Sequence, residues 1–312
     1  MNRQPSDLRI TGLFFTIPTI LLIIGYFLYP YPPTATMQQL IIIPLFLGLI
    51  LLAIGLIIPQ KTKSSQVKIA GWAFFSFFWS TQPAFLYLSE AGDVFNGAVC
   101  VIGVYILFYM AYQEWLSIQN QEYPSCLQWI AGGAAIAGLI YFTIDGGIFP
   151  ALKEWLIVTV STHSTLLLRL FNIPAEQFES LIIYNGTPIR IIFACTAIQS
   201  MVLFVGMIGA LTVVPIKRRF LGISVTVIPI YFLNLIRNAG IIWMVGSGAT
   251  DFSTAHNIIG KAGSLLALIL LLFLTFKITP ELFDQIEAVF GLTKRDGPIE
   301  RTFQKLVKRS NQ

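Results

Sequence analysis

The sequence predicts an all-α polytopic membrane protein: a helix bundle with about eight transmembrane helices plus an amphipathic helix at the outer surface. Composition carries this prediction, because 55% of the 312 residues are hydrophobic and only 11% are charged. A soluble domain has about 25% charged residues. The apolar residues also fall in runs of about twenty, the length that a helix needs to cross a bilayer.

Eight apolar runs are candidate spans, in chain order 10–29, 38–58, 68–88, 94–113, 127–146, 190–213, 220–246 and 255–279. No small-residue cleavage site follows the first run, so we expect a span there and not a removable signal peptide. The tail mixes charged residues with a helical apolar pattern, which predicts a short surface helix followed by a flexible basic end. The predicted domains are 1–280, embedded in the membrane, and 281–312, a cytoplasmic tail.

Basic residues predict the sidedness of the chain. They cluster in 60–68, in 217–219 and in the tail, whereas loops 30–37 and 89–93 have no Lys or Arg. Since short cytoplasmic loops are enriched in Lys and Arg, both termini are predicted to be cytoplasmic. Residues 148–171 would reverse this parity if they crossed, and they hold many polar side chains. We therefore expect them to form an amphipathic helix that lies on or dips into the outer surface.

An extracytoplasmic segment, 172–189, should follow this helix, and its Asn185-Gly186 pair predicts a turn. The net charge of +5 lies at helix ends and in the tail, so it indicates topology and not a nucleic-acid partner. Cys100, Cys126 and Cys195 are too widely spaced for a zinc or disulfide framework. With only two histidines in the chain, we expect no metal and no cofactor.

Arg237 is the most informative residue, because it lies within the apolar run 220–246. A guanidinium stays charged, and placing it at the centre of a bilayer costs about 3 kcal/mol or more. A chain keeps such a residue where it meets partners inside the bundle. The predicted topology supplies Cys195, about 7 Å below the outer surface at 1.5 Å per residue, and His256, at the outer end of the last span. Three helices thus bring Cys, Arg and His to a similar depth.

These three residue types support acyl-transfer chemistry. The thiolate is the nucleophilic form of cysteine, and nearby positive charge favours it. His256 can act as a base towards Cys195 and then as an acid towards a leaving amine. Arg237 can stabilise the oxyanion of a tetrahedral intermediate. This combination predicts a thiol acyl transferase or protease at the extracytoplasmic boundary, whereas Cys100 and His163 are expected to be a packing residue and an interfacial residue.

Five further polar residues flank the predicted site and are candidates for supporting it: Asn234, Asn238, Asp251, Gln199 and Arg190. Asn234, one turn below Arg237, could orient its guanidinium, or both asparagines could form a purely structural network with the arginine. The aspartate lies in the outer loop before His256 and could orient its imidazole. Of the other two, the glutamine could line the pocket one turn below Cys195, and the arginine, at the mouth of the same helix, could anchor at the membrane interface.

Three short motifs resemble the exosortase/archaeosortase family: Phe193-Ala194-Cys195-Thr196-Ala197, Asn234-Leu235-Ile236-Arg237-Asn238, and Ala255-His256-Asn257 with Gly260. Two C-terminal stretches are similar to the archaeal subgroup of that family: Pro280-Glu281-Leu282-Phe283 and Arg295-Asp296-Gly297-Pro298. The resemblance is specific over 190–280. Over the first five spans it extends only to hydropathy and order.

Members of that family are multi-spanning cysteine transpeptidases, similar to sortases in chemistry but not in fold. The resemblance implies that Cys195 is the nucleophile, Arg237 the essential arginine and His256 the third member. This chain departs from the family at two positions. Many relatives have glycine where it has Ala197, and some archaeosortases have arginine where it has His256. The third role could therefore require a cation and not a proton shuttle.

The resemblance also implies the partners. Substrates would be surface or secreted proteins with a C-terminal sorting signal, which combines a short motif of the Pro-Gly-Phe type, a transmembrane helix and a basic cluster. The enzyme would cut at the motif on the outer side of the cell membrane, and a membrane lipid would be attached to the new C-terminus. The resemblance further implies an archaeal source.

Two other classes of function remain open. A transporter would use Arg237 as an anion site, and it would need further polar residues along a water-accessible path. Residues 10–58 are nearly free of such side chains in their apolar runs, which counts against this class. A non-enzymatic scaffold would instead keep Arg237 within a structural polar network.

Overall fold

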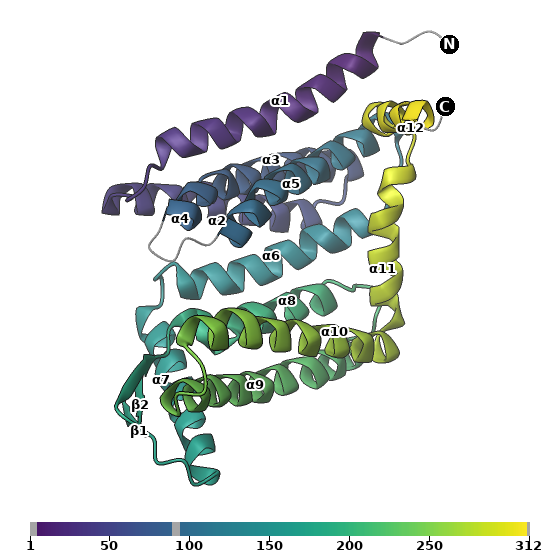
Figure 1. Ribbon diagram of the computed structural model, residues 1–312. Coiled ribbons are helices and arrows are strands. Elements are labelled where there is room, and N and C mark those ends of the chain that lie inside the picture. Colours follow the sequence, from purple (N-terminus) through teal and green to yellow (C-terminus); the bar gives the residue numbers. More distant parts are fainter. Residues whose placement is uncertain (1–4, 89–93, 311–312) are drawn as a thin grey trace. The chain divides into compact units, whose positions relative to one another are not determined.

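The computed structural model describes the backbone of residues 5–88 and 94–310, and the side chains of 7–88 and 94–304. The predicted outer loop 89–93 lies outside these residues. Helices dominate the described chain (Figure 1). Six of the described helices are long and apolar enough to cross a membrane: Asp7–Leu28, Ala35–Ile57, Val94–Asn120, Ser125–Asp145, Ile216–Gly246 and Thr254–Ile278. The prediction of an all-α polytopic membrane bundle is therefore confirmed, although the number of spans is not.

The chain divides into two compact units. Unit 1 comprises residues 1–135 and 285–312, and unit 2 comprises residues 136–284. The divisions fall inside α6 (Ser125–Asp145) and inside α11 (Pro280–Gly291). The separation of a membrane domain from a tail at residue 280 stays a prediction.

Unit 1 contains most of the N-terminal helices: α1 (Pro5–Leu28), α2 (Ala35–Ile57), α3 (Lys61–Ser80), α4 (Gln82–Leu88) and α5 (Val94–Asn120). Helix α3 packs most extensively against α2 and α5. The apolar run 68–88, predicted as one span, is divided at Thr81 between α3 and α4. Pro83 follows at once in the first turn of α4, a position where proline is tolerated because it needs no N–H donor.

Within unit 1, the C-terminal segment packs against α5 through Glu300, which is only 4% exposed. Its carboxylate accepts hydrogen bonds from three side chains of α5: the hydroxyls of Tyr109 at 2.6 Å and Tyr112 at 2.8 Å, and the amide of Gln113 at 2.7 Å. A buried carboxylate is stable only when such donors replace its water.

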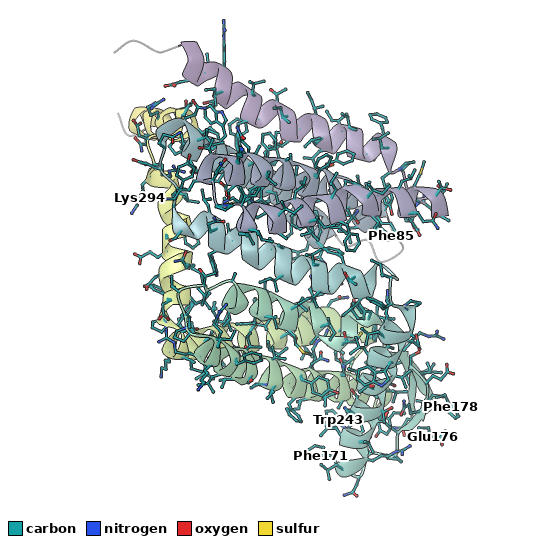
Figure 2. All side chains as sticks on the ribbon, turned by 180° about the vertical axis from the view of Figure 1, so that it is seen from behind. Phe85, Phe171, Glu176, Phe178, Trp243 and Lys294 are labelled. Atoms are coloured by element: carbon teal, nitrogen blue, oxygen red, sulfur yellow. The ribbon has the colours of Figure 1, made fainter. Side chains whose placement is uncertain are left out.

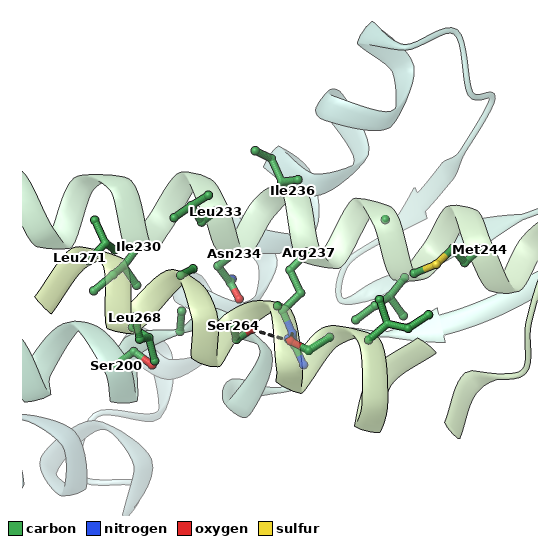
Figure 3. Close-up of a pocket in the computed structure, with 17 residues that line it drawn as sticks. Ser200, Ile230, Leu233, Asn234, Ile236, Arg237, Met244, Ser264, Leu268 and Leu271 are labelled. Carbon is green, nitrogen blue, oxygen red and sulfur yellow. Dashed lines mark hydrogen bonds between the residues drawn. The ribbon is translucent and has the colours of Figure 1, made fainter. Parts of the chain in front are cut away.

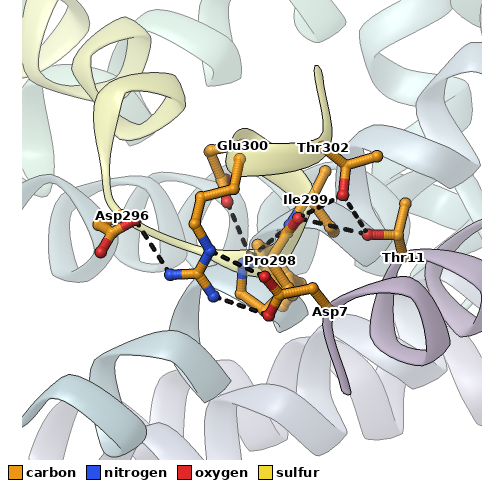
Figure 4. Close-up of polar contacts among 9 residues, drawn as sticks. Asp7, Thr11, Asp296, Pro298, Ile299, Glu300 and Thr302 are labelled. Atoms are coloured by element: carbon orange, nitrogen blue, oxygen red, sulfur yellow. Dashed lines mark hydrogen bonds and ion pairs between the residues drawn. The ribbon is translucent and has the colours of Figure 1, made fainter. Parts of the chain in front are cut away.

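Arg301 ties the same segment to α1. It donates to Asp7 at 2.8 and 3.0 Å and to Asp296 at 3.0 Å (Figure 4). These hydrogen bonds, above all those to Asp7, raise the pKa of the Arg301 guanidinium. Helix α12 (Pro298–Ser310) continues from here. The prediction of one short surface helix and then a flexible end is therefore wrong over 295–304, because long-range polar contacts hold these residues.

Unit 2 contains α7 (Pro150–Leu170), α8 (Ile198–Gly209), α9 (Ile216–Gly246) and α10 (Lys261–Ile278). Figure 1 shows α8, α9 and α10 running alongside one another, with α7 crossing them at the end where the strands lie. Phe171, Phe178 and Trp243 mark this end in Figure 2.

Helix α7 is amphipathic, as predicted. It buries one face, formed by Ile157, Val160, Ser161, Ser164, Thr165 and Leu168, and exposes large apolar residues such as Trp155 and Leu170. These buried positions recur at intervals of three and four residues, the pattern of a helix that packs on one side. Its place at the membrane surface stays a prediction.

A small antiparallel sheet follows α7, in the order β1 (Glu176–Phe178), β2 (Leu181–Tyr184), β3 (Thr187–Arg190). Asn185 and Gly186 have φ values of 48° and 76° and join β2 to β3. Positive φ at both positions is what a two-residue hairpin turn requires, so the predicted turn is confirmed. The Asn185 side chain donates to the carbonyl of Gly246 at 3.2 Å, which fastens the sheet to the end of α9.

Candidate active site

Cys195 lies in a short 3₁₀ turn, η1 (Phe193–Thr196), between β3 and α8. The predicted span 190–213 is therefore wrong: Arg190 ends a strand, and α8 begins only at Ile198. An apolar run of this length is compatible with strand, turn or helix, so periodicity could not detect the break. The predicted depth of Cys195 assumed a continuous helix and does not hold.

Ala197 connects this turn to α8 with a left-handed backbone, φ 59° and ψ 10°. Residues other than glycine adopt this conformation at a cost of about 1–2 kcal/mol, because Cβ approaches the following carbonyl oxygen. The position therefore suits the glycine that many family members are expected to carry. It lets the chain turn sharply between the cysteine and the first turn of α8.

Two asparagines of α9 hold the cysteine backbone. The carbonyl oxygen of Cys195 accepts hydrogen bonds from Asn234 at 2.8 Å and from Asn238 at 3.0 Å. Both asparagines are buried, with 7% and 3% of their surface exposed. Two donors on one carbonyl restrict how the turn can rotate. Asn234 was predicted to orient Arg237, but its amide donates to the cysteine instead.

Arg237 lies on the same helix and is half-buried. Its Nε donates to the carbonyl of Gly260 at 3.3 Å, and one terminal nitrogen donates to Asn238 Oδ1 at 3.4 Å. Asn238 therefore links the Arg237 guanidinium to the backbone carbonyl of Cys195. A Cβ added to Gly260 would lie 3.1 Å from Nε, so the guanidinium stem passes directly over this glycine.

His256 lies in a π-helical segment, η2 (Thr254–Gly260), that leads into α10. Its ring stacks on Phe252, with centroids 5.2 Å apart and an interplanar angle of 13°. Arg237 donates to the carbonyl of Gly260 in this same segment, so the structure brings His256 into the neighbourhood of Arg237. Single π-helical turns are frequent at functional sites.

Asp251 caps this segment and does not contact His256. Its carboxylate accepts hydrogen bonds from the Thr254 hydroxyl at 2.7 Å and from the Thr254 backbone N–H at 2.9 Å. These hydrogen bonds, the one from the hydroxyl first, hold the pKa of Asp251 below its ordinary value. The aspartate therefore positions the backbone that carries the histidine, and the predicted contact with the imidazole is absent between these two residues.

The remaining polar residues named from the sequence do not contact Cys195, Arg237 or His256 through any hydrogen bond or ion pair between described residues. Gln199 and Arg190 are exposed, and Arg190 ends β3 on the side of the turn before Cys195. Cys100 is buried in α5, where it packs. His163 hydrogen-bonds through Nδ1 with the Tyr231 hydroxyl at 2.5 Å.

An apolar groove of about 340 Å³ opens beside Arg237, between α9 and α10 (Figure 3). Its walls are mostly aliphatic and glycine positions, and a few polar groups face it: Ser200, Asn234, Arg237 and Ser264. The groove reaches Ala197, so it begins beside the turn that carries Cys195. Sequence reasoning missed Ser200, Ser264 and the Gly260 carbonyl, because only the packing of the helices places the two serines on the groove and the carbonyl within reach of Arg237.

This is a multi-pass membrane protein in which Arg237 lines an apolar groove that reaches Ala197, next to the turn of Cys195. The family model for the transmembrane exosortases (Exosortase_EpsH) matches residues 63–273, more than half of the chain and a range that includes Cys195, Arg237 and His256. The chain belongs to this family of membrane protein-processing enzymes, as its motifs predicted.

One curated relative extends the match. The chain is similar to Archaeosortase A of Haloferax volcanii, with 24% identity over 275 residues that cover 76% of this chain and 88% of the relative. No solved structure matches the chain.

Proposed function

We propose that this protein is a cysteine transpeptidase that cleaves a C-terminal sorting signal, of the Pro-Gly-Phe type, from surface proteins and couples cleavage to lipid attachment. One observation carries the proposal. Asn238 donates to the carbonyl of Cys195 and accepts from Arg237, so one side chain holds both the backbone of the cysteine and the guanidinium. Nucleophile and oxyanion stabiliser must be held in a fixed mutual position for acyl transfer.

The proposed reaction begins with attack of the Cys195 thiolate on the scissile carbonyl carbon, which forms a C–S bond and an oxyanion. Arg237 stabilises that oxyanion through charged N–H donors. The intermediate then collapses, the C–N bond breaks, and a thioester on Cys195 remains. The leaving amine takes up a proton. His256 supplies it if the imidazole acts as a general acid; if His256 acts only as a second cation, water supplies it.

The groove between α9 and α10 suits the acyl donor. Its lining runs along α9 from Ile230 to Met244, a length of about 21 Å at 1.5 Å per residue. Gly240, Gly263 and Ala267 keep the walls thin, which lets another backbone approach closely. A transmembrane substrate could therefore enter sideways from the lipid, with its motif at the level of Arg237.

The proposed sidedness puts both termini in the cytoplasm and the site at the outer boundary of the cell membrane. It rests on the positive loops 60–68 and 217–219 and on the position of α7 and the sheet at one end of unit 2. A reporter fused after Ile173 should read outside. A cytoplasmic signal at that fusion would contradict the sidedness without touching the chemistry.

The proposal is tested by replacing Cys195 with Ala and with Ser. Each variant is co-expressed with a protein that carries the sorting signal, and the mass of the mature C-terminus is measured. We expect uncleaved substrate with Cys195→Ala and full processing with Cys100→Ala, the matched control at a buried packing cysteine. Continued cleavage by Cys195→Ala would refute the mechanism.

A further inference from the structure

A second pocket, of about 480 Å³, lies next to the cysteine turn. Phe193 and Ala194, the residues before Cys195, form part of its wall, whereas the apolar groove begins at Ala197, two residues after the cysteine. The rest of its lining comes from the end of α6, the first half of α7, the turn between β1 and β2, and the end of β3 with the two residues after it. The two cavities thus border the nucleophile turn at its two ends.

The two cavities differ in chemistry. Four charged side chains line the second pocket: Asp145, Lys153, Glu154 and Arg190. The apolar groove has only one, Arg237. A molecule that is apolar where it binds would prefer the groove, and a charged, hydrated molecule would prefer the second pocket.

Lys153 and Asp145 form an ion pair with each other. The Lys153 ammonium donates to the Asp145 carboxylate at 2.8 Å and to its backbone carbonyl at 3.0 Å. It also lies 5.3 Å from the centre of the Phe193 ring, which Tyr141 contacts at 5.7 Å. This pair therefore steadies the residue two positions before Cys195.

The other two charged residues of the pocket, Glu154 and Arg190, do not take part in this ion pair. Both are exposed, and within the described part of the chain neither forms an ion pair or a hydrogen bond. The pocket therefore offers a ligand one free carboxylate and one free guanidinium. A carboxylate attracts an ammonium group, and a guanidinium binds carboxylate or phosphate oxygens through two parallel N–H donors.

We propose that this pocket is the acyl-acceptor site, and that the acceptor carries a primary amine together with an anionic group. The inference rests on the proposed function, in which a thioester on Cys195 awaits a second substrate. Glu154 binds the amine end, and Arg190 binds the anionic end. The donor then occupies the apolar groove while the acceptor reaches the same carbonyl carbon from the polar side.

The transfer step balances without an oxidant or a reductant. The acceptor ammonium gives one proton to Glu154 or to water and attacks as the neutral amine. The C–N bond forms, the C–S bond breaks, and sulfur leaves as the Cys195 thiolate. The nitrogen then releases a second proton to water. Water competes for the same thioester and gives the free acid.

The experiment measures the ratio of amide to free acid at the new C-terminus. The full-length protein and a substrate with the sorting signal are placed in phosphatidylcholine vesicles, which contain no primary amine. One arm adds phosphatidylethanolamine to the vesicles and the other adds soluble glycine. We expect an amide product in at least one arm, and the productive arm identifies a lipid headgroup or a soluble amine as the source. Free acid alone in both arms overturns the proposal.

The variants Glu154→Gln and Arg190→Gln test the site itself. Each should lower the amide-to-acid ratio about tenfold, the effect of losing one hydrogen bond to a charged group. Arg190→Lys keeps the charge and should recover part of the ratio. Glu176→Gln, an exposed carboxylate on β1, is the matched control and should keep the wild-type ratio.

Two results would overturn the acceptor site. One is an unchanged ratio in both variants. The other is a parallel loss of amide and acid, because thioester formation does not need the acceptor. Failure of the proposed function is distinguishable from either, since it appears as cleavage that persists in Cys195→Ala.

Discussion

Unit 1 and unit 2 each hold charged side chains within apolar helices, but in different surroundings. In unit 1, Lys68 and Glu114 are 3% and 1% exposed and lie 2.7 Å apart. In unit 2, Arg237 is half-buried beside a groove, and its two hydrogen bonds, to Gly260 and Asn238, are 3.3 and 3.4 Å long. N–H···O hydrogen bonds are normally 2.7–3.2 Å, so both contacts are long and both acceptors are neutral.

The difference distinguishes charges that serve only to hold the structure together, those of Lys68 and Glu114, from a charge that can bind a ligand, that of Arg237. Lys68 and Glu114 neutralise each other, so their charges have no further use once the helices are packed. Among the residues that the structure describes, Arg237 has no carboxylate partner. Its charge and part of its donor capacity remain for a ligand in the groove. This contrast leads us to expect stability effects in unit 1 and activity effects in unit 2.

The largest effect should follow from breaking the buried pair. Glu114→Ala leaves Lys68 buried without its counter-charge, so stability should fall by about 3–5 kcal/mol. The measurement is thermal unfolding in detergent. The 2.7 Å approach of Lys68 to Glu114 Oε1 lacks the direction of a hydrogen bond, so the attraction is ionic.

The control for this prediction is the double variant Lys68→Met with Glu114→Met. Removing both charges together should recover much of the lost stability, since apolar replacements of buried pairs are often neutral. If the single variant unfolds at the wild-type temperature, the pair is not the structural charge that the comparison requires.

The next largest effect concerns Arg237. Arg237→Ala should lower the cleavage rate about 10²–10³-fold, the usual result of removing one oxyanion donor. Its unfolding temperature should stay close to wild type, because the substitution removes only two long hydrogen bonds. Arg237→Lys keeps the charge but loses the planar fork, so full activity in that variant would mean that charge alone suffices.

A smaller effect is expected from the asparagines. Asn238→Ala removes a donor to the Cys195 carbonyl and an acceptor for Arg237, so the cleavage rate should fall about tenfold or more. Asn234→Ala is the matched comparison, because it removes only a donor to the same carbonyl. Equal losses in the two variants would argue against the link between arginine and cysteine through Asn238.

The smallest expected effect is a gain in stability. Ala197→Gly relieves the left-handed strain at φ 59°, and it should raise stability by about 0.5–1 kcal/mol after the entropic cost of glycine. Ala194→Gly, in the same turn but without a positive φ, is the control and should lower stability slightly. Loss of stability with Ala197→Gly would show that the strain is absent or is offset elsewhere.

The sequence predicted the parts of this protein that depend on local pattern. Apolar runs located most helices, Asn185-Gly186 located a turn, and α7 was recognised from its polar residues. The break between β3 and α8 escaped prediction because Ile191 to Ala194 are apolar in any conformation. The docking of Glu300 escaped as well, because a glutamate near a terminus is ordinarily exposed.

By itself, the sequence determined the membrane class, the helical fold and the family, because composition, periodicity and short motifs are properties of neighbouring residues. Only the tertiary structure decided how the candidate site is held. The bonds from Asn234 and Asn238 to Cys195 join positions 39 and 43 residues apart. Such contacts arise when α9 packs against the turn before α8, and the two cavities beside Cys195 exist only after that packing.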